Sequence, residues 1–381
     1  MSIFKDKTLM ITGGTGSFGN AVLNRFLRTD IGEIRSGGGG SKPSPIPQWI
    51  REHVVFYYDV KKQGATNETL KESAYLQDLS GKGRRMKLNN FLFAEMSGVD
   101  GYKNEAFVNV NGAIDIRFDH INGRQIKGKP AQDWVKFGYY RAKNVVERII
   151  YCKWHVEGIL DDNKVYVAQY TACDNRVELH NGDNYIELDT NQGKVGYNYI
   201  SVISDQPYST DITITQIPEY PGALVTDGVD DYGLVEGLSS GVKMLFMTVN
   251  PIGDFNISKM YYSQRKDPIN IDPFYIFTMG NNNIAYAGNP SGVTYINGVL
   301  NKSIKYNELF GVKHTITTVN ANVKPETSKA PSFFWEDVNT RDCFSKIAFY
   351  NSIAFDSIPT EADGFTEQEL IDYVLTNIIG Q

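Results

Sequence analysis

The stretch Gly222-Ala-Leu-Val-Thr-Asp-Gly-Val-Asp-Asp-Tyr-Gly233 combines a short apolar run, a turn rich in Gly and Asp, and the start of a second run. The run Ala223–Val225 has the length and apolarity of a buried strand. Gly228 can adopt the positive φ that a tight turn needs. The stretch therefore predicts two antiparallel strands joined by a tight turn.

The same pattern of strand and turn recurs on both sides of this stretch. Downstream, Ser291–Leu300 predicts a β-hairpin with Asn297-Gly298 at its tip, the dipeptide that two-residue hairpin turns favour. Three further segments predict strands: Val54–Tyr58, Met86–Phe93 and Phe344–Tyr350. A polar turn at Leu76–Gly83 precedes the second of them. The main part of the chain is therefore expected to be mainly β.

Taken in this order, the segments resemble the concanavalin A-like, laminin-G-type (LamG) jelly roll. In that family the segments corresponding to Leu76–Gly83 and Gly222–Gly233 are neighbours, whereas here residues 98–218 separate them. The resemblance implies a jelly-roll sandwich formed by residues 50–97 and 219–381, with a second domain inserted at residues 98–218.

Residues 98–218 alternate apolar and polar side chains with a period of two in several places. Lys164–Tyr170, Asn184–Leu188 and Asp211–Ile217 are examples. This alternation predicts a small antiparallel β-sandwich for the inserted domain.

The chain ends in a predicted helix. Thr366 and Glu369 have the spacing of a capping box, in which each satisfies the other's backbone N–H. The apolar residues that follow recur at helical spacing and would pack the helix down: Leu370, Ile371, Val374, Leu375 and Ile378.

The amino-terminal segment has a different character. An apolar run, Thr8–Thr12, is followed by the turn Gly13-Gly-Thr-Gly-Ser-Phe-Gly19 and by helical spacing in Asn20–Leu27. These residues resemble the start of extended short-chain dehydrogenases, in particular the nucleotide-sugar 4,6-dehydratases. The resemblance implies a β-α fragment in which Gly13, Gly16 and Gly19 let the backbone approach a dinucleotide pyrophosphate.

The fragment is separated from the rest by Ser36-Gly-Gly-Gly-Gly-Ser41, a run typical of an artificial flexible linker. We therefore read residues 1–35 as an orphan Rossmann-type fragment joined through a Gly/Ser/Pro linker at residues 36–49. Tyr139 and Lys143 have the Tyr-x-x-x-Lys spacing of the same enzymes, but the residues between 42 and 138 lack alternating strand and helix periods. We therefore rank a working NAD(P)-dependent dehydratase third, after the two function hypotheses given below.

Composition excludes some classes of function. The net charge of −6 gives no basic footprint for nucleic acid. The sequence contains no run of eighteen apolar residues, the length that would predict a membrane-spanning helix. The three cysteines are far apart, so neither a disulfide framework nor a C-x-x-C metal site is indicated. No secretory signal peptide is recognised.

The main part of the chain also resembles proteins of unassigned function from Bacteroides-type bacteria and their phages, several of them tail-associated. That resemblance implies a non-catalytic carbohydrate-binding or adhesion protein at an extracellular, cell-surface or virion location. The alternative is a structural subunit of a phage tail or surface particle that binds other subunits, or copies of itself, without binding glycans. The five dispersed histidines and the lack of a paired-carboxylate run argue against an enzyme.

Exposed aromatic rings and amide side chains are what a sugar-binding face needs. The candidates lie in or beside segments that we expect to be loops: Tyr261, Tyr262, Asn282, Tyr286 and Trp335. The other interpretation of these aromatic residues is that they belong to the core or to cross-strand pairs.

The acidic cluster Asp227, Asp230 and Asp231 has two interpretations. Carboxylates in an oxygen-rich turn can bind Ca²⁺, or they can satisfy the backbone amides of the turn itself. We expect no cofactor, with Ca²⁺ as the one ion to consider.

Overall fold

The computed structural model describes most of the chain, which divides into two compact units, Met1–Glu52 and His53–Gln381. The described residues are 8–12, 33–37, 46–103, 107, 118–130, 149–169, 172–189, 200–238, 241–252, 259–265, 275–279, 283–287, 292–301, 306–323, 328–335, 337–338, 341–342 and 344–380. Of the residues singled out above for a chemical role, six lie outside them: Gly13, Gly16, Gly19, Tyr139, Lys143 and Asn282.

The described part of the first unit contains two strands, β1 (Thr8–Thr12) and β2 (Glu33–Gly37), which pair in parallel with Thr8 opposite Glu33. A parallel pair needs a long crossover connection, as in a dinucleotide-binding unit. Gly38–Ser41 of the predicted linker lie outside the described residues, whereas Ser36 and Gly37 belong to β2. Their backbone groups pair with β1, which outweighs the low strand preference of Gly and Ser. Helix α2 (Gln48–His53) occupies the end of the predicted linker.

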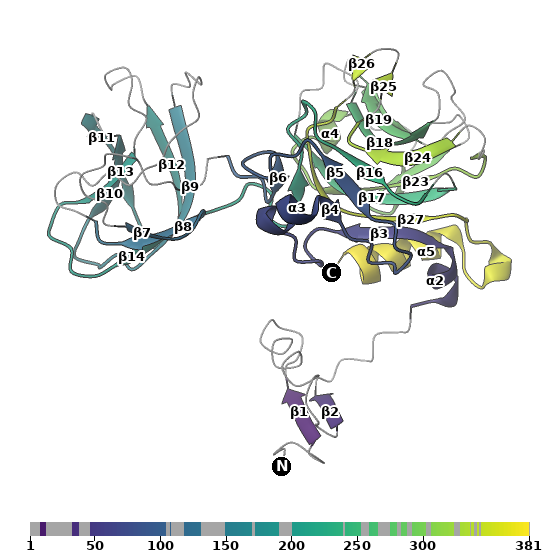
Figure 1. Ribbon diagram of the computed structural model, residues 1–381, viewed down its shortest axis with the longest axis horizontal. Helices are drawn as coiled ribbons and strands as arrows, with labels where there is room; N and C mark the ends of the chain where they lie inside the picture. Colours follow the sequence, from purple (N-terminus) through teal and green to yellow (C-terminus); the bar gives the residue numbers. More distant parts are fainter. Residues whose placement is uncertain are drawn as a thin grey trace. The chain divides into compact units, whose positions relative to one another are not determined.

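The second unit contains two large sheets, all of whose pairs are antiparallel (Figure 1). The order of the eight-stranded sheet is β22-β21-β23-β17-β27-β15-β6, with β3 also pairing with β27. Its strands are β3 (Val54–Asp59), β6 (Gly98–Val99), β15 (Leu224–Val225), β17 (Met244–Pro251), β21 (Val293–Ile296), β22 (Val299–Asn301), β23 (His314–Val319) and β27 (Ile347–Phe355).

The order of the seven-stranded sheet is β20-β19-β18-β24-β16-β5-β4. Its strands are β4 (Tyr75–Leu76), β5 (Met86–Asn89), β16 (Tyr232–Val235), β18 (Lys259–Arg265), β19 (Tyr275–Met279), β20 (Asn283–Ala287) and β24 (Ser328–Phe333). Short elements outside the sheets are α3 (Asn67–Ser73), α4 (Tyr306–Leu309), β25 (Asp337–Val338), β26 (Arg341–Asp342) and η3 (Glu361–Asp363).

One core lies between these two sheets, which together we call the host sandwich. Met247 from β17 and Phe56 from β3 meet Phe333 and Tyr262 from the seven-stranded sheet. The Phe333 ring lies 5.1 Å from the Tyr262 ring and 5.9 Å from the Phe56 ring, both edge to face. Such contacts add to the stability that burial of the rings provides. The prediction of a mainly β fold with antiparallel sheets is confirmed.

Eight further strands form a smaller sandwich, the insert sandwich, with all its pairs antiparallel. A five-stranded sheet of order β12-β9-β14-β8-β7 and a three-stranded sheet of order β11-β10-β13 enclose a core that contains Trp154 and Phe118. The strands are β7 (Phe118–Asn122), β8 (Gln125–Gly128), β9 (Ile149–Glu157), β10 (Val165–Gln169), β11 (Ala172–Leu179), β12 (Gly182–Asp189), β13 (Ile200–Ser204) and β14 (Ile212–Gln216).

The chain leaves and re-enters the host sandwich through one strand pair. Val99 of β6 lies opposite Leu224 of β15. Backbone hydrogen bonds continue the pairing outward, from Tyr220 N–H to the Asp100 carbonyl (2.9 Å) and from Glu219 N–H to the Gly101 carbonyl (2.8 Å). Both ends of the inserted segment therefore start from adjacent strands of one sheet.

The predicted carboxy-terminal helix is present. Thr366 caps α5 (Glu367–Tyr373) in a capping box with Glu369, and a π-helix, η4 (Val374–Ile379), continues it. Gly298 at the hairpin tip has a φ of 82°, a conformation that favours glycine, and it lies against Leu375 of η4. In the part of the chain that the structure describes, every helix is too short or too polar to cross a bilayer.

Candidate functional site

The outer face of the five-stranded insert sheet carries an unusual set of exposed side chains. On β9, Cys152, Trp154 and Val156 are at most 2% exposed and face the core. Because successive strand residues point to opposite faces, the residues that alternate with these three face outward. They are Tyr151, Lys153, His155 and Glu157.

The neighbouring strand β12 places matching residues on the same face. Directly opposite each other in the ladder are His155 and Asp183, Lys153 and Tyr185, and Tyr151 and Glu187. Figure 1 shows β9 and β12 running side by side. Side chains at such positions, and at the diagonal ones, are within contact range.

Two aromatic rings on this face are exposed to solvent. Tyr185 is 71% exposed and Tyr151 is 42% exposed, although both belong to regular strands. They occupy diagonal positions with Lys153 between them. The Lys153 ammonium lies 5.9 Å from the centre of the Tyr185 ring, and the Lys103 ammonium lies 4.5 Å from that of Tyr151.

The two tyrosines border a shallow hollow of about 140 Å³. Charged side chains complete its wall, and Lys153 Nζ forms an ion pair of 2.6 Å with a carboxylate oxygen of Glu219. The lining residues are Lys103, Tyr151, Cys152, Lys153, Tyr185, Ile186, Glu187 and Glu219. The hollow thus combines ring faces with both hydrogen-bond donors and acceptors.

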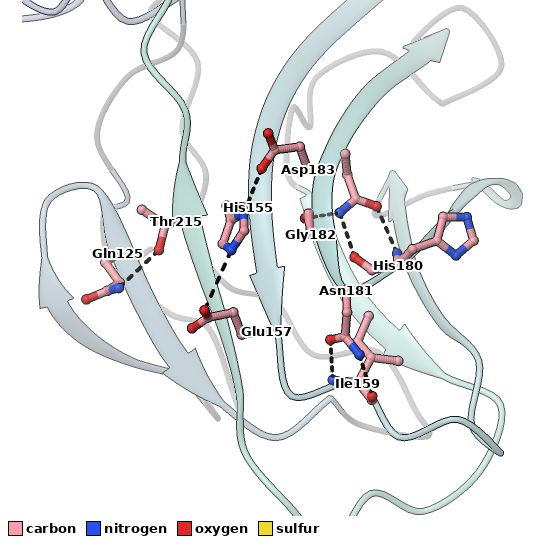
Figure 2. A network of polar contacts seen from close by, with 10 residues as sticks. Gln125, His155, Glu157, Ile159, His180, Asn181, Gly182, Asp183 and Thr215 are labelled. Atoms are coloured by element: carbon pink, nitrogen blue, oxygen red, sulfur yellow. Dashed lines mark hydrogen bonds and ion pairs between the residues drawn. The ribbon is translucent and has the colours of Figure 1, made fainter. Parts of the chain in front are cut away.

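A row of polar side chains also crosses this face, next to the tyrosines along β9 and β12. Figure 2 shows the members of the row. His155 Nδ1 lies 2.6 Å from Asp183 Oδ1, and His155 Nε2 lies 3.6 Å from Glu157 Oε1. On the next two strands, Gln125 Nε2 donates to Thr215 Oγ1 over 3.0 Å. The hydrogen bond to Asp183 is the main reason that the pKa of His155 is raised.

The turn that precedes Asp183 is fixed by two asparagines. The Asn184 amide bonds to the N–H and carbonyl of His180 at 2.8 and 2.7 Å. Asn181 does the same with the N–H and carbonyl of Ile159 at 2.9 and 2.7 Å. Figure 2 shows these contacts at the edge of the polar row. The edge strand that holds Asp183 and Tyr185 is therefore well anchored.

This arrangement does not suit metal coordination. The two carboxylates approach different nitrogens of His155, on opposite edges of its ring, so the three groups do not converge on one ion. What the face offers is ring surface for stacking, with hydrogen-bonding groups around it.

The structure corrects the prediction for Tyr261 and Tyr262. Both lie in β18, between β19 and β24, rather than in a loop, and they are 1% and 0% exposed. Both belong to the core of the host sandwich, so neither ring is available to a sugar. This is the core interpretation that the sequence left open.

The other predicted sugar-binding residues have mixed positions. Trp335 is half-buried against Tyr232 and Phe344, at ring distances of 5.1 and 6.2 Å. Tyr286 lies in β20, and its side chain is not among those described. Asn282 lies outside the described residues.

The acidic residues of the Asp227–Asp231 turn do come together, with carboxylate oxygens within 4.8 Å of one another. Asp231 is fully buried, and its oxygens accept from Ser97 Oγ (3.0 Å) and Asp227 N–H (2.8 Å). Asp227 in turn accepts from the N–H of Val229 at 2.7 Å. These bonds agree with the role of satisfying the turn's own amides, and Ca²⁺ binding stays a prediction.

Burial also changes the chemistry of one member of this cluster. Desolvation raises the pKa of Asp231 to about 7, although the hydrogen bond from Asp227 N–H favours the charged form. A carboxyl group that is half protonated near neutral pH is a weaker cation ligand than an ionised one.

Comparison with known proteins gives matches to short segments only. UDP-glucose 4-epimerase of Rickettsia massiliae is 83% identical over 29 residues, 8% of this chain and 8% of that protein. The same enzyme of Rickettsia bellii is 79% identical over 61 residues, 16% of this chain and 14% of that protein. The chain thus spans a small fraction of the curated relatives that it matches.

These matches to a nucleotide-sugar enzyme are consistent with the resemblance of the amino-terminal fragment to nucleotide-sugar 4,6-dehydratases. No family model matches the chain. No solved structure matches it either.

Proposed function

We propose that the chain is a non-catalytic carbohydrate-binding or adhesion protein of the phage-tail or cell-surface type, and that it binds glycans on the outer face of the insert sheet. The observation that carries this proposal is the 71% exposure of Tyr185 beside Tyr151 on a regular sheet. Exposed apolar surface that gathers on one face, here two neighbouring rings, is characteristic of interaction sites, whereas single exposed residues are ordinary.

The chemistry of the face matches that of a sugar. Pyranose rings present apolar C–H faces, which stack on tyrosine rings, and equatorial hydroxyls, which need both donors and acceptors. Around Tyr185 the donors are Lys153 and His155, and the acceptors are Asp183 and Glu187. A flat antiparallel face can place these groups along several sugar units of a chain.

The finer fold assignment belongs to the same proposal. The LamG-type jelly roll implied by the sequence is supported by two antiparallel sheets around one core and by the hairpin β21–β22 at Asn297-Gly298. In this proposal the host sandwich is the scaffold, and the insert sandwich presents the glycan site.

A glycan array probed with the intact chain tests this function. We expect saturable binding by the unmodified protein and a loss of at least ten-fold in affinity for Tyr185→Ala and for Tyr151→Ala. Tyr166→Ala is the matched control, because Tyr166 lies on the other sheet of the insert with its ring against Arg176. Binding that is equally strong in the Tyr185 and Tyr151 variants would refute this site, and no binding to any glycan would refute the function.

A second candidate, assembly into a particle, is favoured by one observation. Strand β22 is an edge of the eight-stranded sheet, and its residues Val299 and Leu300 are 70% and 50% exposed. Such an edge can pair with the same edge of a second copy. Light scattering of the intact chain should then show a dimer that Val299→Lys dissociates; a monomer at all concentrations would exclude it.

A further inference from the structure

A larger cavity lies where the chain passes from the host sandwich into the insert. Its volume is about 540 Å³, which is within the range of small-molecule binding sites. Helix α3, the segment 93–102 and the tip of the β7–β8 hairpin line it. Small-molecule sites occur preferentially where two domains meet. The glycan face proposed above does not include this cavity.

Contacts within the described residues hold the wall of the cavity in place. Tyr102 N–H donates to the Glu95 carbonyl over 2.8 Å, which ties the start of the insert to the host. The Arg124 guanidinium lies 3.9 Å from the centre of the Tyr102 ring, and Arg124 Nη1 donates to Gln216 Oε1 over 2.6 Å. Because these contacts engage the guanidinium, Arg124 is part of the wall.

The backbone that borders the cavity is unusual. Phe93, Glu95 and Asp100 have φ values of 51°, 47° and 69°, in the left-handed region that non-glycine residues seldom adopt. All three line the cavity. The Asp100 carboxylate accepts from Gly222 N–H over 2.7 Å, which helps to hold this conformation. Such backbone conformations cluster at sites of function, so the segment agrees with a binding role for the cavity.

Two carboxylates of the wall have no partner. Neither the Glu68 nor the Glu95 side chain forms a hydrogen bond or an ion pair with the described residues. With Asp100, three carboxylates and one guanidinium line the cavity, so its net charge is negative. Burial raises the pKa of Tyr102, and the Asp100 and Glu68 carboxylates raise it further against the opposing effect of Arg124. This field attracts a cationic ligand.

Two amide groups add hydrogen-bond donors to the wall. Asn67 Oδ1 accepts from Val99 N–H over 2.7 Å and Asn122 Oδ1 from Arg124 N–H over 2.8 Å, which leaves each Nδ2 for a ligand. Among the described residues, the acidic groups that converge closely enough for one metal ion are those of the Asp227–Asp231 turn. The wider spacing of the carboxylates in this cavity suits a larger, organic cation.

We propose that this cavity binds a disaccharide of amino sugars whose amines are not acetylated. The ammonium groups donate to the Glu68 and Glu95 carboxylates, and the sugar hydroxyls accept from the Asn67 and Asn122 amides. The ligand class follows from the wall, because unpaired carboxylates need a cation and amide donors need hydroxyl oxygens. The site is separate from the insert face and does not depend on the function proposed for that face.

Isothermal titration of the intact chain at about pH 6, where amines are protonated, tests the site. The probes are the β-1,4-linked disaccharide of glucosamine and its neutral N-acetylated form. We expect saturable binding of the free amine and at least ten-fold weaker binding of the acetylated form. Glu68→Gln and Glu95→Gln should each weaken binding of the free amine at least ten-fold. Glu72→Gln, on an exposed residue of the same helix outside the cavity, should leave it unchanged.

The double variant Tyr151→Ala/Tyr185→Ala separates this cavity from the proposed glycan face. Binding of the free amine that persists in the double variant supports the cavity site, even if the insert face binds no glycan. Binding that is lost there, or that neither glutamate variant weakens, overturns the proposal, with the melting temperature of each variant as the check of folding. Absence of binding, or equally tight binding of the acetylated form or of putrescine, a diamine without hydroxyls, overturns it too.

Discussion

The two sandwiches use their aromatic residues in opposite ways. In the host sandwich, Tyr262 is completely buried and packs edge to face on Phe333. In the insert sandwich, Tyr185 occupies an equally regular strand and is 71% exposed. The same residue type in the same secondary structure is thus core in one domain and surface in the other.

The reason lies in how many faces of each sheet are covered. Strand β18, which holds Tyr262, is buried at every position from Met260 to Gln264, so both faces of the seven-stranded sheet are closed there. The insert strand β9 alternates between buried and exposed positions, so one face remains open to water. A tyrosine in a strand therefore indicates a binding face only where the other face of the same strand already forms the core.

Truncation of the two tyrosines should give the largest difference between the sandwiches. Tyr262→Ala should lower the free energy of unfolding by about 3–5 kcal/mol, because it leaves a large cavity in the host core. Tyr185→Ala should change it by less than about 0.5 kcal/mol. Urea denaturation followed by tryptophan fluorescence measures both. Similar losses for the two variants would show that Tyr185 is structural.

A second test compares two carboxylates, buried Asp231 in the host and exposed Asp183 in the insert. The folded-state pKa of Asp231, about 7, lies above the ordinary aspartate value of 3.8, so folding favours the protonated form. The stability that this group contributes is complete below pH 4 and is lost as the pH rises towards 7. We expect a loss on the order of 2–4 kcal/mol over this window.

Denaturation between pH 4 and 8 checks this loss. Asp231→Asn should flatten the profile in that window, whereas Asp183→Asn, the control, should leave the slope in place. A profile that is the same for Asp231→Asn and the unmodified chain would contradict the role of Asp231.

The smallest effect concerns two histidines, and NMR titration can resolve it. The pKa of His155 is raised, chiefly by its hydrogen bond to Asp183, whereas burial lowers that of His314. His155 should therefore titrate at the higher pH of the two. Asp183→Asn should bring the His155 midpoint down and leave that of His314 where it is. A midpoint of His314 at a higher pH than that of His155 would contradict the open insert face.

Much of the fold could be predicted from local patterns. The strands at Val165–Gln169, Gly182–Asp189 and Ile212–Gln216 match the predicted alternating segments, and the capping box of Thr366 and Glu369 is confirmed. These features depend on residues close together in the sequence, where period and capping chemistry are sufficient.

The candidate site could not be predicted in the same way. Strand β9 was missed, although Cys152, Trp154 and Val156 alternate with polar residues and were the available signal. The site itself arises from the pairing of β9 with β12, and register between distant strands cannot be read from one sequence. The aromatic candidates Tyr261 and Tyr262 failed because residue type does not reveal whether a strand is covered on both faces.

The junction between the sandwiches has a mechanical consequence. Both chain connections to the insert start at the pair β6–β15 and continue through the hydrogen bonds of Asp100 with Tyr220 and of Gly101 with Glu219. A pulling force on the insert therefore acts on both strands from the same end and opens their hydrogen bonds one after another, like a zipper. Bonds broken in sequence yield at lower force than bonds sheared together. Under load the outer bonds at Asp100 and Gly101 would open first, before the force reaches Val99 and Leu224 of the host core, and this outer part of the junction would act as an elastic tether.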